Sequence, residues 1–166
     1  MKTLSATLLL FVYFQSFGQA FKLPEPDVEK IGKQMEDANY SDDLIQFYLE
    51  NNFNSTTGRI DKKFEEWGNG PEICAFSLKF ENDIFYTINQ CGEGKGLSNS
   101  VRFPTTDMDL IWTWIEQIHK INQPSSSTNI WKKEAMLYAP EDDGAGCWYE
   151  IKLGDTSTTI EIYCGC

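Results

Sequence analysis

Two stretches with the same outline decide the fold of this chain: CAFSLKFENDIFYTINQCG, residues 74–92, and CWYEIKLGDTSTTIEIYCG, residues 147–165. Each begins with a cysteine, has a second cysteine seventeen residues later and then a glycine. Apolar and polar residues alternate along much of both stretches, which is typical of half-buried strands. Each stretch therefore predicts a β-hairpin that carries one cysteine on either strand.

In the first hairpin, a two-residue turn at Asn82-Asp83 places Cys74 directly opposite Cys91. Counted outward from the turn, this is a non-hydrogen-bonded pair of positions. Facing side chains lie closest at such a pair, which suits a disulfide bond. We therefore predict a Cys74–Cys91 disulfide that closes the open end of the hairpin.

In the second hairpin, a turn centred on Asp155-Thr156 places Cys147 opposite Cys164 in the same way. We predict a Cys147–Cys164 disulfide, with Cys166 as the alternative partner of Cys147. The cysteine left over, most simply Cys166, is either a tail thiol or, with Cys164, half of a redox or metal site.

The N-terminal residues resemble a cleaved export signal. Lys2 gives one positive charge, residues 4–17 are mostly apolar, and small residues precede a cut after Ala20. The apolar run is shorter than the roughly 20 residues that span a membrane, so an uncleaved anchor is the weaker alternative. We predict that residues 1–20 are removed and that residues 21–166 form a single domain outside the cytoplasm, either secreted or periplasmic. This compartment permits the two disulfides.

The composition narrows the class of partner. The chain has 14 Lys and Arg against 25 Asp and Glu, a net charge of −11, and loss of Lys2 with the signal makes it −12. This balance argues against binding to nucleic acid or to anionic membranes. It favours a basic partner, although solubility alone is the simpler explanation.

Helix signals precede both hairpins. Residues 41–43 provide an N-cap and an acidic first turn, and Thr106 to Asp109 has the pattern of a capping box. Asp-Leu-Ile occurs in both places, at residues 43–45 and 109–111. The predicted fold is therefore α+β, an antiparallel sheet built around two disulfide-stapled hairpins with helices on one face. It is either an internal duplication, with pseudo-repeats at 27–96 and 104–166, or one domain with two similar hairpins.

Other segments follow from periodicity. Residues 28–38, 42–51 and 107–121 are expected to be helices, and a strand is expected near 134–139. The spacing of Ile60, Phe64 and Trp67 predicts a further short helix after a polar loop. Residues 123–129 are expected to form a hinge.

One helix face and one acidic turn are the candidate functional residues. Trp112, Glu116 and His119 lie at helical spacing on the face opposite the isoleucine stripe of residues 107–121. They are read as a surface contact patch, or as a His119 general base paired with Glu116, or as an ordinary solvated face.

The acidic turn contains Glu141, Asp142 and Asp143. It is read as a contact point for a basic partner, with a calcium site and a plain solvated turn as the alternatives.

Catalytic and cofactor motifs are scarce. With a single histidine and no Gly-x-Ser-x-Gly, no serine triad can be read, and no zinc or phosphate-loop spacing occurs. We expect no cofactor and no metal. The leading hypothesis is a secreted, non-enzymatic protein-binding domain, for example an inhibitor or immunity protein for a basic exported partner. A carboxylate-based hydrolase of the cell envelope and a small-ligand carrier are the alternatives.

Overall fold

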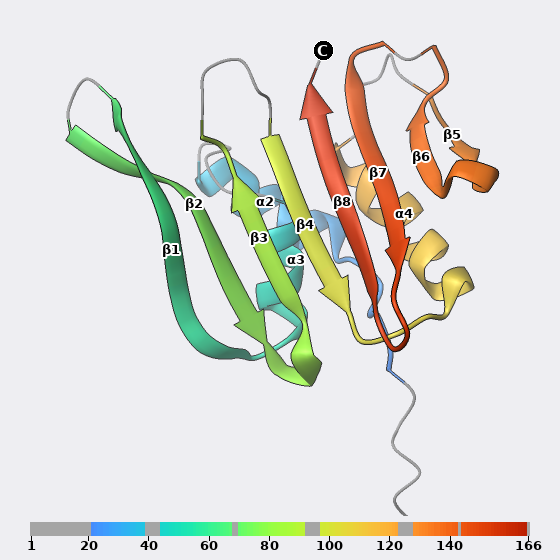
Figure 1. Cartoon of the computed structure of the whole chain (residues 1–166), viewed down its shortest axis with the longest axis horizontal. Coiled ribbons are helices and arrows are strands. Elements are labelled where there is room, and N and C mark those ends of the chain that lie inside the picture. Colours follow the sequence, from blue (N-terminus) through green and yellow to red (C-terminus); the bar gives the residue numbers. More distant parts are fainter. Residues whose placement is uncertain are drawn as a thin grey trace, which may run out of the picture.

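The computed structural model describes residues 21–38, 44–67, 70–91, 97–122, 128–142 and 144–165. In this part of the chain it has three α-helices and one eight-stranded antiparallel sheet, and an α+β fold is therefore confirmed (Figure 1). The helices are α2 (Val28–Asp37), α3 (Leu44–Asn52) and α4 (Met108–Asn122). The strands are β1 (Ser55–Trp67), β2 (Gly70–Phe80), β3 (Phe85–Asn89), β4 (Leu97–Phe103), β5 (Asn129–Lys132), β6 (Leu137–Pro140), β7 (Gly146–Leu153) and β8 (Thr158–Gly165). Two short 3₁₀ turns follow β2 and β5, at Glu81–Asp83 and Lys133–Ala135.

The strand order is β1-β2-β3-β4-β8-β7-β6-β5, with every neighbouring pair antiparallel. Strands that follow one another in the chain lie side by side except at the centre, where β4 pairs with β8. In Figure 1 the helices lie behind the strands.

A single hydrophobic core joins the helices to the sheet. The predicted stripe of α4 is buried: Ile111, Trp114, Ile115 and Ile118 are at most 1% exposed. Trp114 is the largest fully buried side chain among those that the structure describes, and its ring centroid lies 4.9 Å from that of Phe103 on β4. On the strands alternate residues enter the same core, as the two-residue period of a strand requires.

Both predicted disulfides are present, but the register of the first hairpin differs from the prediction. The Phe80 N–H donates to the Ile84 carbonyl over 2.9 Å, so the turn has three residues, Glu81–Asp83. Asn82 and Asp83 both have φ of 57°, a conformation that Asn and Asp tolerate better than most residues. The extra turn residue shifts the pairing by one.

The shift changes how the first disulfide closes. Gln90, not Cys91, lies opposite Cys74, and its N–H donates to the Cys74 carbonyl over 2.8 Å. Cys91 follows the end of β3, where the chain has left the ladder, and it bonds Cys74 across a Cα–Cα distance of 4.9 Å. The predicted pair of cysteines is therefore correct, although they are not directly opposite residues.

The second hairpin matches its prediction throughout. Gly154 donates to the Ser157 carbonyl over 2.8 Å, and the ladder pairs Ile151 with Ile160 and Cys147 with Cys164. The Cys147–Cys164 disulfide spans a Cα–Cα distance of 4.0 Å.

The short helix predicted around Ile60, Phe64 and Trp67 is wrong. These positions lie on β1, a thirteen-residue strand at the edge of the sheet. Its pairing with β2 shifts register at four places. Each shift interrupts the two-residue period of the strand, so the spacing of its apolar residues does not follow regular alternation. Bulges of this kind also protect an edge strand against pairing with another chain.

The start of α4 is one residue later than the capping box predicts. The side-chain oxygen Oδ1 of Asp107 accepts hydrogen bonds from the N–H groups of Asp109 and Leu110, at 3.1 and 3.2 Å. Asp107 is therefore the N-cap, and Thr106 is not.

Several predictions fall on residues outside the described ranges: the signal at 1–20, the N-cap at 41–43, most of the hinge at 123–129, Asp143 and Cys166. Among the described residues, no helix has the length and apolar character needed to cross a membrane.

Candidate functional site

The structure places His119 in the core, which corrects the prediction of a surface patch on α4. Its side chain is 3% exposed, and its ring meets the rings of Tyr138 and Tyr149 edge to face at centroid distances of 5.2 and 5.8 Å. The two tyrosines belong to β6 and β7, so side chains of these two strands pack against His119. Burial lowers the pKa of His119.

Trp112 and Glu116 face strand β5 and its end. Glu116 accepts a 2.7 Å hydrogen bond from the indole N–H of Trp131, whose ring centroid lies 6.0 Å from that of Trp112. The Lys133 ammonium lies 4.6 Å from the centre of the Trp112 ring. These contacts tie α4 to the β5 end of the sheet, and the carboxylate of Glu116 is engaged by Trp131.

The acidic turn after β6 is on the surface. Glu141 and Asp142 are exposed, and Asp142 accepts a hydrogen bond from the N–H of Gly144 over 3.1 Å. Within the described ranges, no group of three or more His, Cys, Asp or Glu side chains is placed to hold a metal ion.

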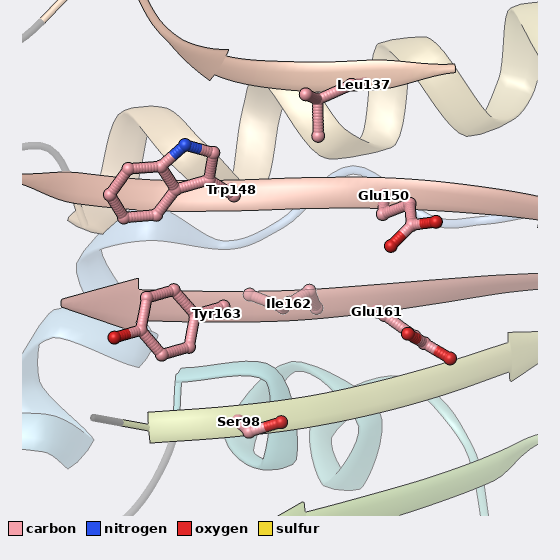
Figure 2. A pocket seen from close by; sticks show the side chains of 7 residues that line it. All are labelled: Ser98, Leu137, Trp148, Glu150, Glu161, Ile162 and Tyr163. Atoms are coloured by element: carbon pink, nitrogen blue, oxygen red, sulfur yellow. The ribbon is translucent and has the colours of Figure 1, made fainter. Parts of the chain in front are cut away.

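A different surface has the shape of a site. Along β4, β8 and β7, every second side chain points away from the core. On the face that these side chains form, a hollow of about 290 Å³ lies over the strands. We call this face the outer face. Figure 2 shows the side chains that line the hollow, with helices behind the strands. The lining residues are Ser98, Leu137, Trp148, Glu150, Glu161, Ile162 and Tyr163, of which Ile162 is itself buried in the core.

The strand register arranges the hollow in two rows. In one row Ser98 pairs with Tyr163, and Tyr163 pairs with Trp148. The two rings are tilted against each other with centroids 5.6 Å apart. Because Tyr163 is 38% exposed and Trp148 half-buried, the pair presents apolar surface to solvent.

In the neighbouring row Glu161 pairs with Glu150 directly across β8 and β7. Like charges at facing positions repel, and Lys152 offsets this repulsion. Its ammonium lies 2.6 Å from Glu161 and 3.9 Å from Glu150. The hydrogen bond to Glu161 raises the pKa of Lys152. The cluster has two carboxylates for one ammonium, and all three side chains are about half exposed.

A glycine makes room for the aromatic pair. A Cβ atom on Gly165 would lie 2.7 Å from the Tyr163 hydroxyl and 3.0 Å from the ring carbon that bears it. The glycine that follows the second cysteine of the motif therefore lets the Tyr163 ring lie over the end of β8.

Comparisons with protein-family models, with curated proteins and with solved structures found no match to this chain.

Sequence reasoning did not select the hollow, although the signal was present. The register predicted for the second hairpin places Trp148 opposite Tyr163 and Glu150 opposite Glu161, and the structure has these pairs. Their side chains alternate with the buried Tyr149, Ile151 and Ile162. Two aromatic residues facing each other on the solvent side of a hairpin are the observation that would have identified this surface.

Proposed function

We propose that this chain is an exported, non-enzymatic domain that binds a basic partner protein, as an inhibitor or immunity protein would, through the outer face of β4, β8 and β7. The observation that carries the proposal is the hollow, in which the pair Trp148 and Tyr163 adjoins the pair Glu150 and Glu161. Export is supported by the two disulfides, which persist in an oxidising compartment.

The chemistry of the hollow suits a protein interface. Trp and Tyr are the residues most enriched among those that dominate binding energy, because they bury large rigid surfaces. Carboxylates beside them select a cationic side chain, and a net charge of −11 speeds the approach of a basic partner. The outer face replaces the α4 patch as the proposed contact, because His119 is buried and Glu116 is bonded to Trp131.

The hydrolase alternative requires a carboxyl group buried in a cleft with a raised pKa. Among the residues whose side chains are described, the buried polar ones are Asn99, His119, Asn129 and Thr158, and none is an acid. The carrier alternative requires a void between the sheet and the helices, whereas the hollow lies on the outer face. Neither alternative gains support from these observations.

The proposal includes two features of the architecture. The helices would cover only the face of the sheet that carries the buried residues, which would leave the outer face free for a partner. Figure 1, in which the helices lie behind the strands, supports this arrangement. Duplication is supported by the strand order, because exchanging β1–β4 with β5–β8 reproduces it. The same exchange matches the disulfide-bonded hairpin of β7 and β8 with β3 and β4. The first disulfide belongs instead to the hairpin of β2 and β3, so the two disulfide-bonded hairpins are not equivalent. The first repeat would then include β4 and end at Phe103, after the boundary at residue 96 expected from the sequence, and the second would end with β8.

A capture experiment with matched charge variants tests the function. The mature chain is used as bait for exported proteins of the source organism, at low salt and at roughly 0.5 M salt, where screening is strong. Glu150→Gln with Glu161→Gln removes both negative charges of the hollow. Glu141→Gln with Asp142→Asn removes the same charge from the exposed turn and is the control.

We expect one basic protein that is retained by the wild type and by the turn variant, and is lost from the hollow variant and at high salt. If the turn variant loses the partner and the hollow variant keeps it, the acidic turn is the contact surface and the outer face is not. If neither variant changes what is captured, charge at these two surfaces does not direct binding.

A further inference from the structure

We propose that the hollow is the receptor for one arginine side chain of the partner, whose guanidinium stacks on Trp148 and pairs with Glu150. This inference rests on the proposed function and adds the chemical group that the site recognises.

The size of the hollow favours a single side chain. At about 290 Å³ it lies at the lower end of the roughly 300–1,000 Å³ found for small-ligand sites. It lies on the strands of a sheet and is lined by side chains of β4, β6, β7 and β8. A helix or a loop of a partner would rest on the rim, and one long side chain would enter.

The charges in the hollow favour a cation, and one cation is already held there. Lys152 lies 2.6 Å from Glu161, within hydrogen-bonding distance, but 3.9 Å from Glu150, which is the limit of an ion pair. Glu150 is therefore the carboxylate with the weaker partner. Its side chain is 55% exposed, so an incoming cation reaches it from solvent.

The aromatic pair favours arginine over lysine. A guanidinium is planar, stacks on aromatic faces and offers a fork of N–H donors that matches a carboxylate. Trp148 lies on the same strand face as Glu150, two residues away, and Tyr163 adjoins it. A planar group that lies on the indole can thus direct its N–H groups toward Glu150.

The other end of the outer face shows the same chemistry within the chain. Arg102 of β4 lies over the Phe85 ring, with its guanidinium carbon 4.3 Å from the ring centre. The Lys79 ammonium lies 5.1 Å from the same ring. Phe85 therefore carries its own cations, whereas no such contact with Trp148 is found among the described residues.

A titration with a single arginine tests this inference without the partner. The ¹⁵N-labelled mature protein is titrated with Nα-acetyl-arginine methylamide, and the indole N–H resonance of Trp148 is followed. The citrulline analogue, which has the same shape without the charge, is the control, with sodium chloride added to equal ionic strength. The buried Trp114 gives an internal reference.

We expect a saturable shift at Trp148 with arginine and none with citrulline. Glu150→Gln should weaken binding about fivefold or more, since a charge-assisted hydrogen bond is lost. Lys152→Gln should strengthen it about threefold, because the resident ammonium that competes for the carboxylates is removed.

Three results would overturn the inference. One is no shift at about 100 mM arginine probe, a concentration that half-fills even a very weak site. Another is an equal shift with citrulline, which would leave stacking without charge recognition. The third is a shift with an oligosaccharide of N-acetylglucosamine but not with arginine, which would make the aromatic pair a sugar platform. Capture of a basic partner that depends on Glu150 and Glu161, together with a failed arginine titration, would leave the proposed function standing and reject only the arginine.

Discussion

Removal of the Cys147–Cys164 disulfide tests what the two staples contribute to stability. The variant is Cys147→Ala with Cys164→Ala, made in a Cys166→Ser background so that no odd thiol remains to exchange. The matched variant is Cys74→Ala with Cys91→Ala in the same background.

The structure makes the two variants a balanced pair. Both disulfides close loops with a sequence separation of 17 residues. In the chain-entropy treatment, a loop of this length stabilises the folded state by about 3 kcal/mol at 25 °C. The lost apolar burial is also similar, because Cys74 and Cys147 are 7% and 8% exposed. We therefore expect each variant to lose about 3 kcal/mol, and its melting temperature to fall by about 6–12 °C.

The measurement is guanidinium unfolding followed by tryptophan fluorescence, with the free energy in water taken from linear extrapolation. A difference of more than about 1.5 kcal/mol between the two variants, well above additive error, would refute the entropic reasoning. A larger loss at Cys147–Cys164 would mean that this bridge holds the pairing of two strands in register. The first bridge, which closes beyond the end of β3, could not do this.

Two further predictions concern α4. His119→Phe should make the folded protein less sensitive to acid. Because burial lowers the pKa of His119, the unfolded chain binds the proton more readily than the folded chain does. The wild type therefore loses stability as the pH falls below the ordinary pKa of 6.5, by up to about 1.4 kcal/mol per pH unit, until the folded pKa is passed. Equal slopes of unfolding free energy against pH between pH 7 and 5 in both proteins would contradict the burial argument. Asp107→Ala should lower the free energy of unfolding by about 1 kcal/mol, measured by thermal unfolding, because two N–H groups lose their acceptor. Thr106→Ala should change it by less than about 0.5 kcal/mol. A larger loss from Thr106→Ala than from Asp107→Ala would mean that Thr106 is the N-cap.

The second hairpin could be predicted residue by residue because its turn has two residues and its strands alternate without interruption. The first hairpin was shifted by one because Asn82 and Asp83 both take positive φ, which lengthens the turn without altering the composition that suggested it. The predicted disulfide still forms because Cys91 follows the end of β3, where its backbone is no longer paired with β2 and can bring its side chain to Cys74.

Features that depend on contacts between distant segments could not be predicted from the local pattern of apolar and polar residues. His119 has polar neighbours at helical spacing, which predicted exposure, and its burial depends on Tyr138 of β6 and Tyr149 of β7, which are distant in the chain. Residues 60–67 were predicted to be helical because β1 lacks regular alternation, and its pairing with β2 shifts register at four places. The two facing pairs of the hollow, in contrast, follow from the correctly predicted pairing of β7 with β8.

The pairing of β4 with β8 has a consequence for the order in which the sheet is made. Every other pair joins strands that are neighbours in the chain and can zip together locally, whereas β4 waits for β8, the last of the eight strands in chain order. During synthesis the first four strands can assemble, but one side of β4 stays open until the second half emerges. We therefore expect the centre of the finished sheet to form last. Most of the loop-closure entropy of folding is lost when β4 pairs with β8. A chain that stopped before β8 would leave the edge of β4 exposed, although this edge lies at the centre of the complete sheet.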